Sequence, residues 1–73
     1  MKRYAIKNKQ IIDKKLNNAK CDIGLMHESF AEWVCEVLNV WYEQKGEDMQ
    51  LSEDLLRTMH IAYKADITPE DWV

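Results

Sequence analysis

Hydrophobic residues in the middle of the chain recur with the period of an α-helix. Between residues 26 and 45, apolar side chains follow the i, i+3, i+4, i+7 rule and fill one side of a helical wheel. These positions are Met26, Phe30, Trp33, Val34, Val37, Leu38 and Trp41. Gly46 follows directly, and glycine commonly ends helices because it tolerates the left-handed conformation. We therefore predict a helix near residues 27–45.

Capping residues indicate a further helix closer to the C-terminus. Ser52 is a favourable N-cap, and Glu53 and Asp54 follow in the positively polarised first turn. An apolar face comes after the cap and consists of Leu55, Leu56, Met59, Ala62 and Tyr63. We predict a helix near residues 52–65.

The same kind of signal recurs at residues 68–73. Thr68 is suited to the N-cap position and Pro69 to the first helical position. We expect a short capped turn here that docks Trp72 against the core.

The first third of the chain has a weaker pattern. One narrow stripe at about 100° per residue contains Ala5, Ile12, Leu16, Ala19 and Ile23. With Gly24 behind it, this stripe predicts a helix near residues 8–22. Residues 1–7 have a second interpretation as a short extended arm, because Tyr4 and Ile6 alternate with charged residues. The whole pattern predicts an all-α fold: a three-helix bundle with a capped C-terminal turn, forming one domain over residues 1–73.

Length and cysteine content restrict the class of protein. A chain of 73 residues buries only about 60% of the surface that its unfolded form exposes. The two cysteines, Cys21 and Cys35, are too few for a disulfide scaffold, and neither a signal peptide nor a membrane span is apparent. We expect a cytoplasmic protein without membrane contact. The small core and the wide apolar arc of the central helix also favour a homodimer.

The residues with reactive or metal-binding side chains show no known motif. Cys21, His27, Cys35 and His60 lack the CxxC, HxxxH or HExxH spacing of a metal site. A catalytic pair of Ser29 with His27, or of Cys35 with His60, would need a geometry that the spacing does not indicate. The two glycines are too few for a phosphate-binding loop. We expect no metal, no cofactor and no enzymatic activity.

Charge is distributed very unevenly along the chain. Residues 1–20 contain seven Lys and Arg against the single acid Asp13, whereas residues 21–73 contain three against twelve Asp and Glu. The first part therefore has a net charge of +6 and the second −9. This asymmetry implies that something basic lies against the acidic part, either the chain's own first segment or a partner.

The acidic residues of the predicted central helix suggest a function. Glu28, Glu32, Glu36 and Glu43 lie within one arc of the wheel, with Asn39 in the same row. The row is either a solvated helix face or a surface that binds a basic protein partner, including a nucleic-acid-handling enzyme whose phosphate channel it imitates. Trp33 and Trp41 are either core residues or anchors in that interface. We predict a small regulator or inhibitor that acts by protein binding.

The basic segment supports an alternative function. Lys7, Lys9, Lys14 and Lys15 are suited to non-specific contact with nucleic-acid phosphates. The acidic part would repel a polyanion, so such binding would be weak and strongly salt-dependent. In the simpler interpretation, these lysines pair with the chain's own glutamates.

Overall fold

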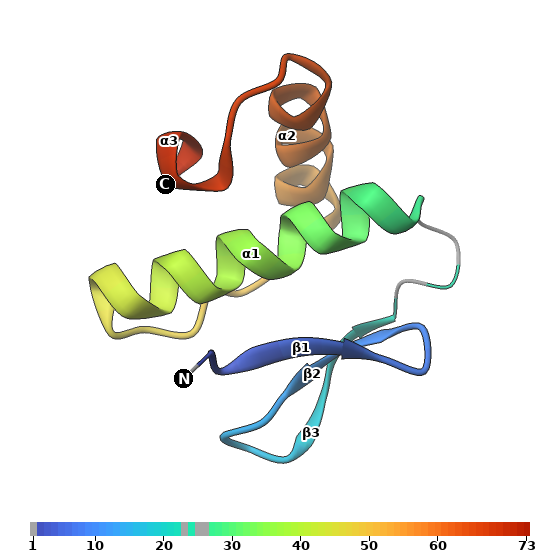
Figure 1. The fold of residues 1–73 in the computed structure, drawn as a ribbon, viewed down its shortest axis with the longest axis vertical. Coiled ribbons are helices and arrows are strands. Elements are labelled where there is room, and N and C mark those ends of the chain that lie inside the picture. Colours follow the sequence, from blue (N-terminus) through green and yellow to red (C-terminus); the bar gives the residue numbers. More distant parts are fainter. Residues whose placement is uncertain (1, 23, 25–26) are drawn as a thin grey trace.

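The chain folds into a three-stranded sheet followed by three helices (Figure 1). A computed structural model describes residues 2–22, 24 and 27–73. The strands are β1 (Tyr4–Lys7), β2 (Gln10–Asp13) and β3 (Asn18–Asp22), and the helices are α1 (Glu28–Lys45), α2 (Glu53–Lys64) and α3 (Pro69–Trp72). The fold is therefore mixed α and β, and the prediction of an all-α three-helix bundle is wrong. Ile23 and Met26, used in that prediction, lie outside the described residues.

The predicted helix near residues 8–22 is replaced by two antiparallel hairpins. The sheet has the order β1-β2-β3, and the turns between strands require backbone conformations that a helix lacks. Asn8 and Lys9 have φ of 52° and 57°, and Asn17 has φ of 56°. Two consecutive residues with positive φ form the kind of tight turn that matches the twist of a β-hairpin. The interpretation of the first residues as an extended arm agrees with β1.

A bulge in β3 redirects one lysine. Ile11 pairs with Cys21 and Ile12 pairs with Ala19, so Lys20 has no partner on β2. An extra residue of this kind bends the strand and re-aims its side chain. The Lys20 ammonium group lies 2.9 Å from the carboxylate of Asp48, in the segment that joins α1 to α2.

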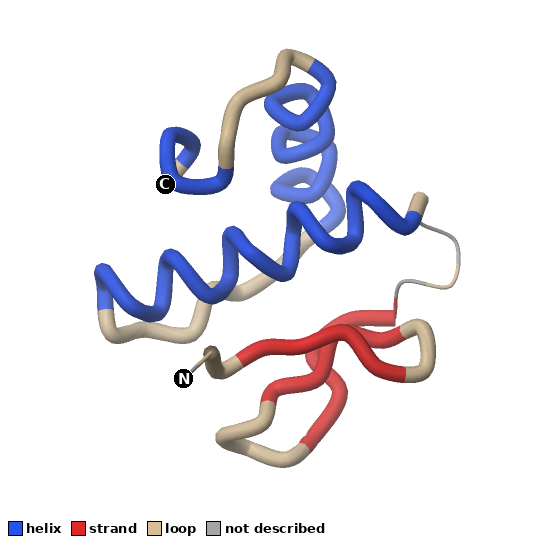
Figure 2. Tube along the Cα trace, viewed as in Figure 1, coloured by secondary structure: helices blue, strands red, loops and turns tan. Residues whose placement is uncertain are grey.

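Helix α1 is the central layer of the molecule. The sheet covers one side of it, and α2 and α3 lie on the other (Figures 1 and 2). The predicted wide apolar arc therefore packs against two neighbours within one chain. The buried core contains Tyr4 and Ile11 from the sheet, residues of α1, and two methionines: Tyr4, Ile11, Phe30, Ala31, Val34, Cys35, Val37, Leu38, Met49 and Met59.

The helices that capping and periodicity predicted are present with nearly the predicted bounds. The Ser52 side chain accepts a hydrogen bond from the Leu55 N–H at 3.1 Å, and that of Thr68 accepts from the Asp71 N–H at 3.2 Å. Trp72 packs against the core with its ring centroid 6.2 Å from that of Trp33. The expected docking of the C-terminal turn is confirmed. Among the described residues, no helix has both the length and the apolar character needed to cross a membrane.

Gly46 gives a direct test of how α1 ends. Its φ is 70°, and a Cβ built there would meet no atom within 4 Å, so only backbone strain opposes a side chain. We expect Gly46→Ala to lower the free energy of unfolding by about 1 kcal/mol, and Gly46→Asn to lower it less because Asn tolerates this conformation. Urea denaturation measures both. Equal stability of Gly46→Ala and wild type would contradict the assigned cap.

Candidate functional site

The acidic row lies on α1 as predicted, and the four glutamates differ in their surroundings. Glu28, Glu32 and Glu43 are exposed. Glu36 is partly buried and accepts a hydrogen bond from the Lys2 ammonium group at 2.9 Å. One glutamate of the row is therefore neutralised by the chain's own N-terminal segment.

Asn39 interrupts the middle of this row. Its side chain is only 3% exposed, because the edge strand β1 lies against it. The Asn39 Oδ1 accepts a hydrogen bond from the Tyr4 N–H at 2.8 Å, and its Nδ2 donates to the Tyr4 carbonyl at 3.1 Å. The amide thus satisfies both outward-facing backbone groups of an edge-strand residue. Between Glu32 and Glu43, about 16 Å apart at the rise of an α-helix, the only carboxylate of the row is the paired Glu36.

Most of the basic segment is used within the fold. Besides Lys2, Arg3 pairs with Asp13 and Lys20 pairs with Asp48. Lys15 donates a hydrogen bond to the Tyr42 hydroxyl at 3.1 Å, and this contact lowers the pKa of Tyr42. Arg3 and Asp13 both belong to the first segment, whereas Lys2 and Lys20 reach acids of residues 21–73. Of the two predicted sources of basic charge, the chain's own first segment therefore supplies part, and a basic partner stays a prediction.

The remaining predicted nucleic-acid ligands do not form one patch. Lys7 ends β1 and Lys9 lies in the turn between β1 and β2, whereas Lys14 lies in the turn between β2 and β3. These turns are at opposite ends of the short β2 strand (Figure 1). All three lysines are exposed, and none forms an ion pair within the part of the chain that the structure describes.

An ionic cluster that the sequence did not reveal lies between the sheet and α1. The Arg3 guanidinium donates two hydrogen bonds to Asp13, at 2.8 and 2.7 Å, and the two side chains are 8% and 1% exposed. The Arg3 guanidinium lies 4.6 Å from the centre of the Tyr42 ring. Hydrogen bonds from Arg3 hold the pKa of Asp13 below its usual value.

A second polar contact group adjoins this pair. The Tyr4 hydroxyl donates a hydrogen bond to Asp48, which also binds Lys20. Burial and this hydrogen bond raise the pKa of Tyr4. Burial opposes ionisation of Asp48, but hydrogen bonds from Tyr4 and Lys20 outweigh it and lower the pKa. Every group in these two clusters has a partner, so they stabilise the fold and offer no free group for chemistry.

The candidate nucleophiles occupy structural positions. Burial raises the pKa of both Cys21 and Cys35, which keeps the thiols protonated. Cys35 accepts a weak hydrogen bond from Asn39, whereas His60 packs edge-on against Phe30 with the ring centroids 5.0 Å apart. The Cys35 and His60 side chains therefore contact different sides of α1.

Ser29 and His27 do meet, but at the start of α1. His27 is the N-cap, and its Nδ1 accepts from the Ser29 N–H. The Ser29 hydroxyl lies 2.8 Å from the same Nδ1 and also hydrogen-bonds the Tyr63 hydroxyl. This chain of contacts ties α1 to α2. Within residues 2–22, 24 and 27–73, no three His, Cys, Asp or Glu side chains gather to hold a metal ion.

The two tryptophans of the predicted interface have different roles. Trp41 is partly buried, and the Lys45 ammonium group lies 5.4 Å from its ring. Trp33 belongs to an aromatic cluster with Tyr63 and Trp72, and its indole Nε1 donates to the Ile67 carbonyl at 2.9 Å. Much of the Trp33 side chain therefore packs against the core, which is one of its two predicted roles. Part of its ring stays accessible to solvent.

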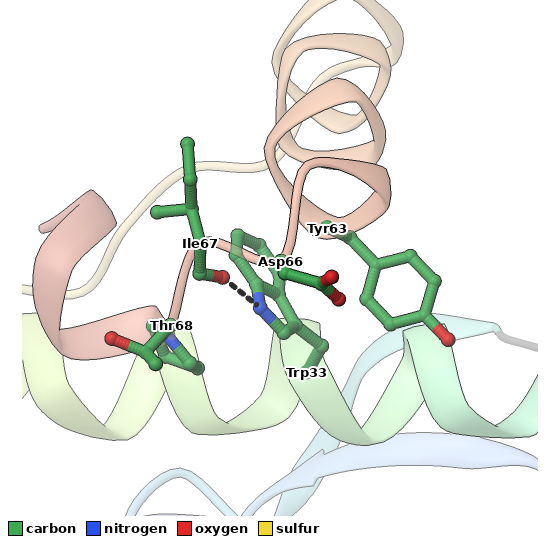
Figure 3. A pocket seen from close by; sticks show the side chains of 6 residues that line it. Trp33, Tyr63, Asp66, Ile67 and Thr68 are labelled. Atoms are coloured by element: carbon green, nitrogen blue, oxygen red, sulfur yellow. Dashed lines mark hydrogen bonds between the residues drawn. The ribbon is translucent and has the colours of Figure 1, made fainter.

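That accessible part of Trp33 forms the wall of a shallow pocket. The pocket has a volume of about 220 Å³ and lies where α1 meets the connection between α2 and α3. Figure 3 shows the Asp66 carboxylate beside the Trp33 and Tyr63 rings. The lining residues are Trp33, Tyr63, Asp66, Ile67, Thr68 and Pro69. Sequence reasoning assigned no binding role to Tyr63 and none of any kind to Asp66, because the turn that brings them together has no clear sequence signal.

Comparisons of this chain with protein-family models, with curated proteins and with solved structures gave no match.

Proposed function

We propose that this protein is a small non-catalytic cytoplasmic regulator that binds a basic surface of a partner protein through the carboxylates of α1. Glu28, Glu32 and Glu43 make the principal contacts. Glu36 contributes less, because Lys2 already neutralises it. The partner is a protein surface and not a channel shaped for a continuous run of phosphates, since Asn39 interrupts the row.

The observation that carries this proposal is the charge left exposed after folding. Three of the cations in residues 1–20 are used in internal ion pairs. Of the twelve acids in residues 21–73, only Glu36, Asp48 and Asp54 form ion pairs among the described residues. The helical side of the molecule therefore remains strongly negative. A field of one sign attracts an opposite surface and accelerates association with it.

The homodimer expected from the sequence is not part of the proposal. That expectation depended on the small core and on an apolar arc wider than one neighbour would cover. Both sides of the arc are packed within a single chain, so the arc no longer favours self-association and only the small core still does.

The variant Glu28→Gln/Glu32→Gln/Glu43→Gln tests the proposal. Its fold should persist or gain slightly, because it removes the like-charge pair Glu28 and Glu32, which costs about 0.2–0.5 kcal/mol. Binding to a fluorescently labelled lysine-rich peptide at low salt should weaken about tenfold, as expected for the loss of three exposed charge contacts. Fluorescence anisotropy measures the affinity. Capture of the natural partner from lysate should fall in parallel.

A matched lysine variant provides the control. Lys7→Gln/Lys9→Gln/Lys14→Gln should bind the peptide at least as well as wild type, and labelled duplex DNA should not bind either protein. A folded glutamine variant that binds the peptide with wild-type affinity would refute the proposal. Salt-sensitive DNA binding that disappears in the lysine variant would support the nucleic-acid alternative instead.

A further inference from the structure

We propose that the pocket formed by Trp33, Tyr63 and Asp66 binds the ammonium group of a lysine side chain on the partner. This inference rests on the proposed function, because it assumes a partner with a basic surface. It adds one defined contact to that surface. The exposed carboxylates of α1 attract cations without selecting among them, whereas a pocket selects a side chain by shape.

The walls of the pocket have the chemistry that recognises an organic cation. The rings of Trp33 and Tyr63 have centroids 6.3 Å apart and planes inclined by 71°. At this separation and angle the two rings meet edge to face and leave no gap for a ligand between them. The ammonium group would therefore lie against the ring surfaces that line the pocket. The face of an aromatic ring carries partial negative charge and attracts an ammonium group, with Trp the strongest of the aromatic side chains. The Asp66 carboxylate supplies a full negative charge beside these rings (Figure 3).

The surroundings also favour a positive charge. The pocket lies at the C-terminal end of α2, where the carbonyl groups give the helix end a partial negative charge. Glu70 and Asp71 follow in the first turn of α3 and add two more acids nearby in the chain. Lys64, in the last turn of α2, adds one positive charge to this region. The three acids outnumber it, so the surroundings favour a cation over an anion.

The two aromatic side chains and the backbone of Asp66 are held in place before a ligand arrives. The hydrogen bond from the Trp33 indole to the Ile67 carbonyl fixes the indole, and the hydrogen bond to Ser29 fixes the Tyr63 hydroxyl. Asp66 has φ of 60°, and its N–H donates to the Tyr63 carbonyl at 3.2 Å. A site whose side chains are already ordered loses less conformational freedom on binding.

The pocket adjoins the acidic row on the same helix. Glu36 is three residues after Trp33 and therefore lies beside it on the surface of α1, and Glu32 immediately precedes it in the chain. A partner segment with one lysine in the pocket would place its neighbouring residues next to these glutamates. The pocket and the row can therefore act on one basic segment.

A pair of small probes tests the pocket alone. N-acetyl-lysine methylamide carries the ammonium group, and N-acetyl-norleucine methylamide is an uncharged analogue of similar length. In NMR titrations at constant ionic strength, the lysine probe should shift the Trp33 indole N–H signal saturably, and the norleucine probe should not. The signal is assigned by its absence in Trp33→Phe.

Asp66→Asn is the informative variant. It removes the charge while keeping the shape, and Asn tolerates the positive φ of this position, so the fold should persist. Affinity for the lysine probe should fall about two- to fivefold, as expected for the loss of one partly screened charge contact. The matched control Glu70→Gln, an exposed acid outside the lining, should fall less. Equal shifts with both probes, or equal titrations of wild type and Asp66→Asn, would overturn the inference.

The experiments distinguish a failure of the pocket proposal from a failure of the proposed function. The variant Glu28→Gln/Glu32→Gln/Glu43→Gln keeps the pocket and should bind the lysine probe as wild type does. If the probe fails while the lysine-rich peptide still requires the glutamates, the pocket is refuted and the proposed function stands. If the lysine probe binds, but the lysine-rich peptide binds the glutamine variant with wild-type affinity, the proposed function is refuted.

Discussion

Asp13→Asn is expected to destabilise the fold by about 3–5 kcal/mol, the range seen when one partner of a buried ion pair is removed. The Asp13 carboxylate is 1% exposed and receives hydrogen bonds from Arg3 and from the backbone N–H groups of Lys15 and Leu16. An amide would place an N–H donor against one of these donors and leave the guanidinium without a counter-charge. A chain of 73 residues has a total stability of roughly 4–11 kcal/mol, so this loss is a large part of it.

The pH dependence gives this prediction a second readout. The pKa of Asp13 is lowered in the folded state, so its contribution is complete above the ordinary aspartate value of about 3.9. That contribution is lost as the pH falls through the lowered folded-state value. Wild type should therefore lose stability below about pH 4, and Asp13→Asn should lack this part of the loss.

Urea denaturation followed by circular dichroism at several pH values measures both effects. Asp54→Asn is the control: it removes the exposed partner of Arg57 and one favourable charge in the first turn of α2, so it should destabilise by no more than about 1 kcal/mol. A stability of Asp13→Asn within about 1 kcal/mol of wild type at neutral pH would show that the buried pair does not stabilise the fold.

The helices could be predicted from the sequence because their signals are local. Periodicity and the caps Ser52 and Thr68 agree with each other, and Gly46 ends α1 in the left-handed conformation. Each of these signals depends on residues within a few positions of one another. Tertiary packing did not have to be known.

The strands were predicted to be a helix because their apolar residues are spaced as on one face of a helix. Ala5 pairs with Ile12, and Ile12 pairs with Ala19, so these residues share a face by lying on adjacent strands. Their separation of seven residues equals two helical turns, and it is also the repeat of a short strand plus a tight turn. The observation that separates the two is the turn chemistry at Asn8 and Asn17, both of which adopt positive φ.

The candidate site was predictable only in part, for a related reason. The exposed glutamates follow from the helical period of α1. The pairing of Lys2 with Glu36 and of Arg3 with Asp13 depends on the register of β1, and local sequence does not set that register. The pocket depends on the turn at Asp66, where a single residue with positive φ directs the chain back over Trp33.

Asn39 gives the second large effect, because it joins α1 to the edge of the sheet. Asn39→Ala would leave the Tyr4 N–H and carbonyl without their partners in a buried position. Each buried backbone group without a partner costs about 1–3 kcal/mol, so we expect a total loss of about 2–6 kcal/mol for the two groups. Gln44→Ala, an exposed change on the same helix, should have little effect. Hydrogen exchange at the Tyr4 amide should accelerate in Asn39→Ala and stay unchanged in Gln44→Ala.

Asn39→Asp separates the hydrogen bonds from the effect of side-chain size. The ionised carboxylate that this change introduces would still accept from the Tyr4 N–H, but its second oxygen would face the Tyr4 carbonyl and repel it. Glu36 lies in the same row and would oppose the added charge. Protonation would restore a donor to the Tyr4 carbonyl and remove both penalties. The difference in unfolding free energy between wild type and Asn39→Asp should therefore shrink from pH 7 to about pH 4, near the usual aspartate pKa. A difference that is independent of pH would show that the contact with the edge strand is not what makes Asn39 important.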